Sequence, residues 1–479
     1  MTHYPELNML IDGTWCKGCE GRSEPVLNPA TEEVLGDLPH ASTADLDAAL
    51  AAAARGFETW KATAPHKRAA ILCKAAALVR DRAGDIAVAL TLENGKPLAE
   101  SKAEIGMAAD ILEFCGEEAK RLFGDIIPGR VPGVRYLVQK EPVGVTLAFT
   151  PWNFPINTYA RKIAPALAAG CSVVAKAAEE TPAAALALGH ALQDAGLPAG
   201  VLNMVFGVPA EVSSHLMAAR AVRKVSFTGS VPVGKHLAGL AAKRMQRTTM
   251  ELGGHAPVVV FDDADVDKAA DILVAGKFRN AGQVCISPTR FYVQERIYDQ
   301  FVDAFAARAA ALTVGNGMED GTQMGPLAND RRLEAMAGFV EDARSSGAQI
   351  VTGGERIGNR GFFFAPTVIK DAPDDCRVMT EEPFGPLAPM TPFKGMDDVL
   401  ERANALELGL AGYAVTTSLE RANRISDALE VGMVGLNTVA VASPEAPFSG
   451  VKESGYGIEG GPASLEPFLV TKAVAQTAL

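Results

Sequence analysis

Cys285 and Glu251 are the residues of this 479-residue chain whose types and surroundings best suit covalent chemistry. Cys285 lies in residues 282–287 (GQVCIS), where glycine and small polar neighbours leave room for a substrate. A thiolate is a strong nucleophile toward carbonyl carbon. Glu251, 34 positions upstream, opens a Leu-Gly-Gly turn whose glycines allow the backbone to approach closely. One thiol and one carboxylate are enough to form a thioester and to hydrolyse it.

Cys285 has an alternative interpretation as a small apolar side chain in the interior, which is a common role of free cysteine. Its glycine, glutamine and serine neighbours favour a reactive loop instead. None of the seven histidines belongs to a catalytic or metal-binding motif, and His255, near the Glu251 turn, is interpreted as structural. Neither HExxH nor paired metal-ligand spacings occur, so the sequence predicts no catalytic metal.

A second chemical signal is the turn in residues 227–234 (FTGSVPVG), which follows a predicted strand and opens a predicted helix. Its glycine spacing lets the backbone approach a pyrophosphate at the helix N-terminus, where free N–H groups favour anions. The alternative is a plain strand–turn–helix connection. Lys176 ends another predicted strand, at the edge where open parallel sheets bind ligands, and Glu179 follows it. The alternative for this pair is a solvated, charged turn.

The elements that must position these residues follow an alternating α/β pattern. The first 120 residues are predicted to be mostly helical, including helices over 45–60 and 67–82. From residue 143 onward short apolar strands alternate with helices, which predicts a parallel sheet. Predicted strands are 143–149, 172–176, 201–205, 223–227, 257–261, 289–293 and 348–351, and predicted helices are 181–195, 209–219 and 298–312. We expect a domain boundary near Gly253 and Gly254.

Composition places the chain among soluble globular proteins, since 48% of its residues are hydrophobic and 21% are charged. Its length predicts two or three domains. The net charge of −12 argues against nucleic acid as a partner, because phosphates would be repelled. No apolar run approaches the roughly 20 residues that span a bilayer, and the N-terminus lacks a secretion-signal pattern. We therefore expect a cytoplasmic protein that does not contact a membrane.

Seven cysteines in a chain of this length do not indicate a disulfide framework. Cys16 and Cys19 form a CxxC pair. A redox or zinc role would require a helix start or a second ligand pair, and neither is evident. The alternative is a hairpin turn, supported by the flanking Gly13 and Gly21.

Six motifs in order resemble the aldehyde dehydrogenase superfamily over nearly the whole chain. Besides the Glu251 and Cys285 segments they are residues 150–155 (TPWNFP), 227–230 (FTGS), 381–386 (EEPFGP) and 447–452 (PFSGVK). The resemblance implies an α/β fold with a Rossmann-like cofactor domain, an α/β catalytic domain and a small β oligomerisation arm. The implied parts are an NAD-binding domain (1–123 and 143–253), a catalytic domain (254–446), arms (124–142 and 463–479) and a return segment to the cofactor domain (447–462).

The resemblance also implies roles for individual residues. Cys285 would attack the aldehyde, the Asn153 amide and the Cys285 N–H would stabilise the oxyanion, and Glu251 would activate water once hydride has passed to nicotinamide. Asn153 has an alternative as a turn residue between two prolines. The implied cofactor is NAD, with NADP possible, because a Glu179 carboxylate would repel a 2′-phosphate. The implied cofactor residues are Thr150, Trp152, Lys176, Glu179, Gly207, Phe227, Gly229, Ser230, Glu382 and Phe384.

Arg161, Arg279 and Ser443 are the implied substrate residues, and an arginine fork suits a carboxylate. Within the family, the chain especially resembles bacterial 2-oxoglutarate-semialdehyde (2,5-dioxopentanoate) and succinate-semialdehyde dehydrogenases. We therefore expect NAD(P)-dependent oxidation of such a carboxylated semialdehyde, in a homodimer or homotetramer. The alternative substrate is another aldehyde (glutarate semialdehyde or an uncharged one), and the alternative role of the arginines is only to brace helices. The alternative function is that of a cofactor-free thiol hydrolase.

Overall fold

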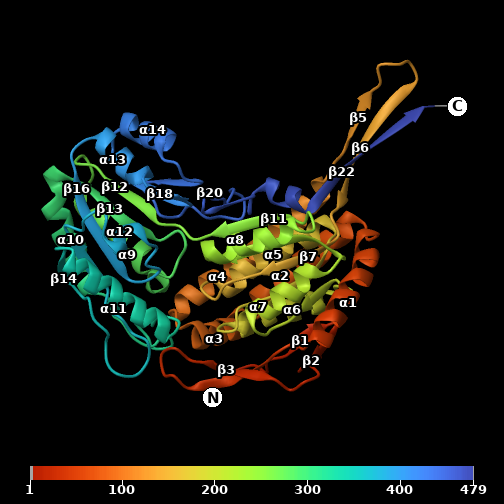
Figure 1. The fold of residues 1–479 in the computed structure, drawn as a ribbon, viewed down its shortest axis with the longest axis horizontal. Coiled ribbons are helices and arrows are strands. Elements are labelled where there is room, and N and C mark those ends of the chain that lie inside the picture. The colour runs from red at the N-terminus through yellow and green to blue at the C-terminus, as the bar shows by residue number, and fades with distance from the viewer. Residues whose placement is uncertain (1–3, 478–479) are drawn as a thin grey trace.

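Two mainly parallel sheets, each covered by helices, form the two halves of the molecule (Figure 1). The computed structural model describes residues 4–477. The chain builds the first half with residues up to Leu252 and the second with residues from Ala256 onward, so residues 253–255 connect them. The C-terminal part then returns to the first half, where residues between 465 and 469 join its core.

The first sheet has eight strands in the order β2-β1-β9-β8-β7-β10-β11-β21, and β7 to β11 pair in parallel. Every residue of β7 and β8 is buried. Strands covered on both faces have continuous apolar runs, which is why these two were predictable. The bounds are β1 (Met9–Ile11), β2 (Thr14–Cys16), β7 (Val145–Phe149), β8 (Ser172–Lys176), β9 (Leu202–Met204), β10 (Val222–Gly229), β11 (Arg247–Leu252) and β21 (Gly455–Tyr456).

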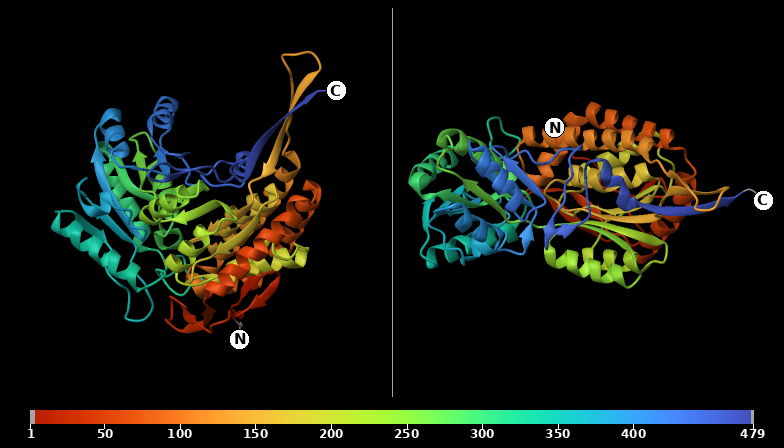
Figure 2. Two further views of the ribbon diagram at one scale, coloured as in Figure 1. Left: turned by 45° about the vertical axis from the view of Figure 1, so that its right-hand side comes forward. Right: turned by 90° about the horizontal axis from the view of Figure 1, so that it is seen from above.

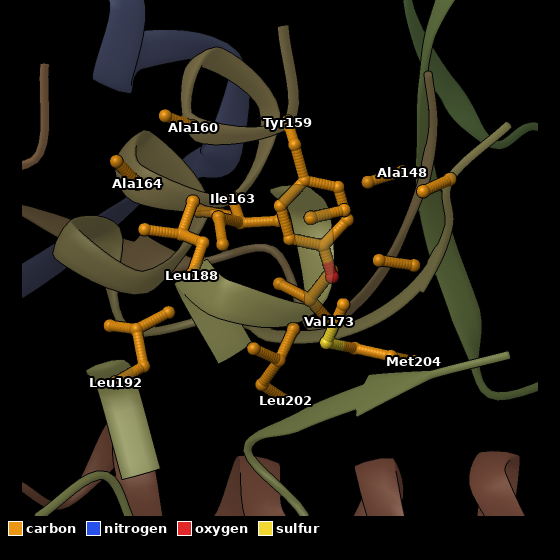
Figure 3. Close-up of a cluster of buried hydrophobic side chains, with 14 of the residues drawn as sticks. Ala148, Tyr159, Ala160, Ile163, Ala164, Val173, Leu188, Leu192, Leu202 and Met204 are labelled. Carbon is orange, nitrogen blue, oxygen red and sulfur yellow. The ribbon is translucent and has the colours of Figure 1, made fainter. Parts of the chain in front are cut away.

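Helix α5 lies in the core of this half, and 13 of its 15 residues are buried. Its Tyr159 and Ile163 pack against Val173 and Met204 of the sheet and Leu188 of α6 (Figure 3). This packing fixes a helix that follows the predicted oxyanion donor and carries two buried cations. The helices of this half are α1 (Thr43–Lys61), α2 (Pro65–Asp81), α3 (Ala83–Asn94), α4 (Leu98–Glu118), α5 (Pro155–Ala169), α6 (Pro182–Ala195), α7 (Pro209–Ala218) and α8 (Val231–Ala242).

The second sheet has seven strands in the order β14-β15-β16-β13-β12-β18-β19, and its edge strand β14 is antiparallel to the rest. Its strands are β12 (Ala256–Val260), β13 (Pro288–Gln294), β14 (Gln349–Thr352), β15 (Thr367–Lys370), β16 (Leu387–Phe393), β18 (Ala411–Val415) and β19 (Met433–Leu436). Its helices are α9 (Val266–Phe278), α10 (Tyr298–Ala310), α11 (Asp330–Ser345), α12 (Arg377–Thr380), α13 (Met396–Asn404) and α14 (Leu419–Ala428). A short pair, β17 (Leu408–Gly409) with β20 (Val451–Lys452), lies outside this sheet.

A three-stranded arm projects from the first half, as both views of Figure 2 show. It consists of β5 (Asp125–Pro128), β6 (Val134–Pro142) and β22 (Leu469–Thr477), and β22 pairs with β6 along its whole length. Ile126, which is 70% exposed, and Tyr136 lie on its surface. Of the β arm expected over 463–479, residues 469–477 form a strand, and 478–479 lie outside the described residues. Residues 463–468 form a 3-10 helix instead.

The prediction that the first 120 residues are mostly helical is wrong for the N-terminal segment. The two expected helices are confirmed as α1 and α2, but four strands precede them. Of these, β3 (Ser23–Leu27) and β4 (Val34–Pro39) pair with each other, while β1 joins the large sheet beside β9. These strands have three to six residues and mixed exposure. They pair as two short hairpins, β1 with β2 and β3 with β4, so their conformation depends on pairing rather than on an apolar pattern within each strand.

The predicted hairpin near the CxxC pair exists, but its turn lies at Asp12 and Gly13. Cys16 ends β2, and Cys19 follows in a bend where its thiol donates to Asp45 over 3.0 Å. The pair is therefore not the turn itself. Asp45 also accepts from the backbone N–H groups of Cys19 and Ser42, so this contact belongs to the cap of α1.

The packing of α1 against the loop before β9 allows a matched stability test. A Cβ at Gly56 would lie 2.3 Å from the carbonyl carbon of Gly200, and backbone cannot yield as a flexible side chain can. We expect Gly56→Ala to destabilise the protein by about 3 kcal/mol. Gly106 in α4 has no neighbouring atom within 4 Å of such a Cβ, so Gly106→Ala should be neutral or stabilise by up to about 1 kcal/mol. Urea unfolding of both variants checks this, and equal stabilities would contradict the packing.

Candidate active site

A cavity of about 600 Å3 lies between the two halves, and most of the residues predicted to do chemistry line it. The carboxyl ends of β10 and β11 open into it, as expected for a ligand site in an open parallel sheet. The predicted nucleophile, Cys285, comes from the second half and the predicted base, Glu251, from the first, so neither half holds the predicted site alone. The predicted residues that line it are Trp152, Asn153, Arg161, Gly229, Ser230, Glu251, Arg279, Cys285, Glu382 and Phe384.

The Cys285 thiol is half-buried in the loop that precedes β13. Burial, with smaller contributions from the carboxylates of Glu382 and Glu251, raises the pKa of this thiol to about 12. Behind the loop, the buried hydroxyl of Tyr413 donates to the Ile286 carbonyl over 2.6 Å. The nucleophile loop is therefore held from behind, and the thiolate is a minor form near neutral pH.

The turn that leads to the nucleophile has a left-handed backbone over three consecutive residues. Asn280, Ala281 and Gly282 have φ of 48°, 52° and 73°. A Cβ at Gly282 would lie 2.1 Å from the Gly385 carbonyl oxygen, so only glycine fits there. The other two residues carry side chains in a conformation that costs energy. Such strain persists only where surrounding contacts impose it, and it is typical of functional sites.

Asn153 lies directly between the two halves, just before α5. Its carbonyl oxygen accepts hydrogen bonds from the Lys96 ammonium over 2.7 Å and from the Asn280 side-chain amide over 2.9 Å. Its own amide nitrogen donates to the Gln283 carbonyl over 3.0 Å. An amide nitrogen carries two N–H donors, so one remains for an oxyanion beside Cys285. These contacts favour the oxyanion role over that of a simple turn residue.

Glu251 is a buried carboxylate on β11, only 2% exposed, and both its oxygens lack a hydrogen-bond partner among residues 4–477. Burial and the nearby Glu459 carboxylate raise its pKa well above the ordinary value, while Lys162 and Arg161 act in the opposite direction. A carboxylate with a raised pKa is suited to take a proton from water near neutral pH.

Sequence reasoning missed the ion pair between Lys162 and Glu459, which lies beside Glu251. Both side chains are buried, and Glu459 also accepts from Ser226 over 3.4 Å. Lys162 stands next to Arg161 on the apolar helix α5, so two adjacent cations on a buried helix were an available signal. The partner of Lys162 could not be predicted, because Glu459 is 297 positions further along the chain.

Two arginines, each beside an aromatic ring, form the cationic part of the cavity wall. Arg161 is buried, and its guanidinium lies 5.1 Å from the Phe448 ring centroid. Its Nη1 has no hydrogen-bond partner within the described residues, and burial lowers its pKa. Arg279 is exposed and lies 5.2 Å from the Phe154 ring centroid. A buried guanidinium with a free N–H group costs desolvation energy that a bound anion would offset.

Ser443 takes part in the site only through Arg161. Its carbonyl accepts from Arg161 Nη2 over 3.5 Å, and its hydroxyl accepts the backbone N–H of Ala446 over 3.2 Å. The neighbouring Ala442 lines the cavity, whereas Ser443 does not. The serine therefore braces the arginine in this structure.

Five of the predicted cofactor residues do not line the cavity: Phe227 lies within β10, and Thr150, Lys176, Glu179 and Gly207 lie at or just after the ends of neighbouring strands. Thr150 follows β7, Lys176 ends β8 and Gly207 follows β9. The backbone N–H of Thr150 donates to the Lys176 carbonyl over 3.2 Å, and the Lys176 ammonium pairs with Glu179. The topology therefore brings these residues to one edge of the sheet, where a nucleotide can lie across the strand ends.

The turn after β10 fits a phosphate group. A Cβ at Gly229 would lie 2.3 Å from the buried Phe227 ring, so the close packing of the turn requires glycine. Ser230 is exposed and opens α8, and its side chain makes no capping bond to the helix. The N–H groups of the first helical turn therefore remain for an anion, and the helix dipole favours one.

The other end of the predicted cofactor site combines aromatic rings with a carboxylate. Trp152 and Phe384 meet edge to face with 5.5 Å between ring centroids, and Arg332 donates to the Phe384 carbonyl over 3.2 Å. Glu382 is half-buried and accepts the Gly254 N–H over 3.2 Å, and burial raises its pKa to about 7. A flat ring attached to a ribose fits this pairing, so the residues present are compatible with a dinucleotide.

Residues 4–477 contain no cluster of three or more histidine, cysteine, aspartate or glutamate side chains arranged to bind a metal ion. Within the same part of the chain, none of the helices has the length and hydrophobicity of a transmembrane segment.

Residues 15–474 match the model of the aldehyde dehydrogenase family. The chain belongs to this family. It is 49% identical to 4-(hydroxymethyl)benzenesulfonate dehydrogenase of Comamonas testosteroni, over 98% of this chain and 97% of the relative. It is 45% identical to 3-sulfolactaldehyde dehydrogenase of Pseudomonas putida (97% and 96%) and 43% identical to the NADP+ succinate-semialdehyde dehydrogenase of Escherichia coli (97% and 96%). The predicted family membership is confirmed, and this aldehyde dehydrogenase is an oxidoreductase.

Solved structures of aldehyde dehydrogenases confirm the predicted fold class. The succinate-semialdehyde dehydrogenase of Burkholderia pseudomallei matches with a TM-score of 0.97 and 42% identity, over 99% of this chain and 98% of the other. A betaine aldehyde dehydrogenase of Staphylococcus aureus, crystallised with NAD+, matches with a TM-score of 0.96 and 32% identity (99% and 97%). The predicted similarity to succinate-semialdehyde dehydrogenases is also confirmed, whereas the relatives and structures named above do not specifically support 2-oxoglutarate semialdehyde.

The raised pKa of Cys285 predicts how the protein alone reacts with iodoacetamide. Because only the thiolate reacts, the rate at Cys285 should rise about tenfold per pH unit from pH 7 to 10 without a plateau. Mass spectrometry of the Cys285 peptide measures this rate, with Cys285→Ser as the blank. Free glutathione serves as the reference, since an ordinary thiol levels off above about pH 8.5. A plateau of the Cys285 rate below about pH 9 would show that the thiol is not desolvated as described.

Proposed function

We propose that this aldehyde dehydrogenase oxidises an aldehyde that carries an acidic group to the corresponding acid, with NAD(P) as the oxidant. The observation that carries this proposal is one shared cavity. Cys285, Glu251 and Asn153 line it together with Arg161 and Arg279, so a nucleophile, a base, an oxyanion donor and an anion-binding wall face one space. A cofactor-free thiol hydrolase would have no use for the phosphate-binding turn and the aromatic–carboxylate end of the cavity.

In the proposed mechanism, the Cys285 thiol first releases its proton to solvent, and the resulting thiolate adds to the aldehyde carbon and forms a carbon–sulfur bond. The carbonyl oxygen becomes an oxyanion, which the free N–H of Asn153 and the backbone N–H of Cys285 stabilise. A dinucleotide held by Trp152, Glu382 and Phe384 would supply, in its nicotinamide ring, an acceptor for the hydride that leaves this carbon. The acyl group stays on the sulfur as a thioester. Glu251 then takes a proton from water, which attacks the thioester and frees the acid and the thiol.

Two arginines support an acidic group on the substrate. The unpartnered Nη1 of the buried Arg161 and the exposed Arg279 provide charge and N–H donors on one wall. We propose a carboxylated semialdehyde, such as succinate, glutarate or 2-oxoglutarate semialdehyde. A sulfonated aldehyde is the second candidate, because two relatives are named for sulfonates at 49% and 45% identity. The Phe154 and Phe448 rings along the wall also suit a larger apolar body between aldehyde and acid.

For the cofactor, we propose a preference for NAD over NADP. Glu179 stays half-buried beside Lys176 at the strand ends, where its carboxylate would accept ribose hydroxyls and repel a 2′-phosphate. The Lys176 ammonium reduces that repulsion, so we expect the protein to use NADP as well, at lower efficiency than NAD. One relative is named for NADP+ and one neighbour was crystallised with NAD+.

For the organisation of the chain, we propose that residues 1–123 and 143–253 form the NAD-binding domain and 254–446 the catalytic domain, with 447–462 returning to the first. The segments 124–142 and 463–479 would be oligomerisation arms of a homodimer or homotetramer. The arm strands support this, because they project from the body with exposed apolar residues such as Ile126 and Tyr136.

Glu251→Gln tests the proposed chemistry, because the variant keeps the shape of the side chain and loses the base. We expect one equivalent of NADH per active site in a burst, followed by steady turnover reduced by about 100-fold or more. Stopped-flow absorbance gives the burst, and intact mass spectrometry detects the acyl group retained on the protein. Cys285→Ser is the control and should give neither. Wild-type steady turnover by Glu251→Gln would exclude it as the base.

Arg161→Met and Arg279→Met test the acidic group. Each change removes charge and hydrogen bonds but keeps an apolar stem, so KM for an acidic aldehyde should rise about 10- to 100-fold. Matched pairs isolate the charge, namely succinate semialdehyde against butanal and 4-formylbenzenesulfonate against benzaldehyde. The uncharged member of each pair should change less than about threefold. Equal losses for both members would mean that the arginines only brace the fold, and the better wild-type pair identifies the substrate class.

A further inference from the structure

The strained turn before Cys285 needs an external support, and the first turn of α4 provides one. Asn280 has a left-handed backbone, and its N–H donates to Glu100 Oε2 over 2.9 Å. Glu100 is 180 positions away and belongs to the other half of the molecule. The remaining contacts of Asn280 bind it to Gln283 within the loop and to the Asn153 carbonyl. Glu100 therefore fixes the backbone of the strained residue itself.

Glu100 also acts on the charge of the same turn. It lines the cavity with Arg279, the residue next to Asn280, and its surroundings include the ammonium of Lys96 and the carboxylate of Glu104. Burial raises the pKa of Glu100, while Lys96, the Asn280 N–H and Arg279 lower it. Two nearby cations and a hydrogen bond from backbone thus hold a half-buried carboxylate in one place.

We infer that Glu100 is a positioning residue that holds the strained turn, so that Arg279 faces the cavity and Cys285 stands at its required place. This inference rests on the proposed roles of Cys285 and Arg279. Each residue with a side chain that is held in the left-handed backbone region costs about 1 kcal/mol or more of conformational energy. The turn therefore relaxes when a contact that imposes this conformation is lost. A shift of about 1 Å at a nucleophile is enough to cost roughly 100-fold in rate.

Three substitutions on one helix separate the possible roles. Glu100→Ala removes the acceptor and the charge, Glu100→Gln removes the charge but keeps an acceptor oxygen, and Lys102→Ala changes an exposed residue of the same turn. We expect amide hydrogen exchange in the peptide over residues 278–285 to speed up about tenfold or more in Glu100→Ala, with a comparable fall in kcat. Glu100→Gln should restore both to within about threefold of wild type, and Lys102→Ala should match wild type.

Two outcomes would overturn the inference. Wild-type exchange and kcat in Glu100→Ala, even with a lower Tm, would leave Glu100 with a structural role only. Equal damage in Glu100→Ala and Glu100→Gln would show that the charge matters rather than the hydrogen bond to Asn280. The exchange measurement requires no turnover, so it tests Glu100 even if the wild type oxidises none of the proposed aldehydes, a result that would instead reject the proposed function.

Discussion

The carbonyl oxygen of Asn153 is the point on which the site depends, because it binds the two halves together. Lys96 and Asn280 both donate to it, from the first half and the second half respectively. The same ammonium pairs with Glu104 over 2.5 Å, and Glu104 accepts the backbone N–H of Ile156 at the start of α5. The Lys96 ammonium, the Glu104 carboxylate and the Asn153 carbonyl are all partnered, which is the condition for burying charge without a large penalty. The proposed oxyanion donor, Asn153, is therefore held in place before any substrate arrives.

The cavity contains several charges whose partners are incomplete, and this imbalance matches its chemistry. Glu251 has no hydrogen-bond partner within residues 4–477 and shares its surroundings with Glu459, so its proton is bound more tightly than in water. Beside an aromatic ring, Arg161 keeps an Nη1 that has no hydrogen-bond partner in the described part of the chain. Buried groups of this kind are unfavourable for stability, and they are retained where a substrate or a proton completes them. The neighbouring Lys162 offsets part of the cost.

The sequence predicted the elements whose apolar runs are continuous and missed those that depend on distant partners. Strands β7 and β8 could be predicted because both faces are buried. Strand β1 could not, since its three residues are too few to show an apolar pattern, and they form a strand by pairing with β2 and, through Leu10, with β9, nearly 200 positions away. The same limit applies to the site. A cation at Lys162 was visible on an apolar helix, but Glu459 is brought to it by the returning C-terminal segment alone.

The sequence by itself determined the chemical groups and the loops that carry them. These signals are local: Cys285 among small residues, Glu251 before two glycines, and the glycine-containing turn after β10. A local backbone conformation restricts which residue types fit, so it can be predicted from the sequence. Only the tertiary structure decided which groups meet, because the cavity lies between halves built from different parts of the chain. The left-handed Asn280 illustrates this. An asparagine does not by its residue type require a left-handed backbone. The hydrogen bonds of Asn280 to Glu100 and to the Asn153 carbonyl hold it in that conformation.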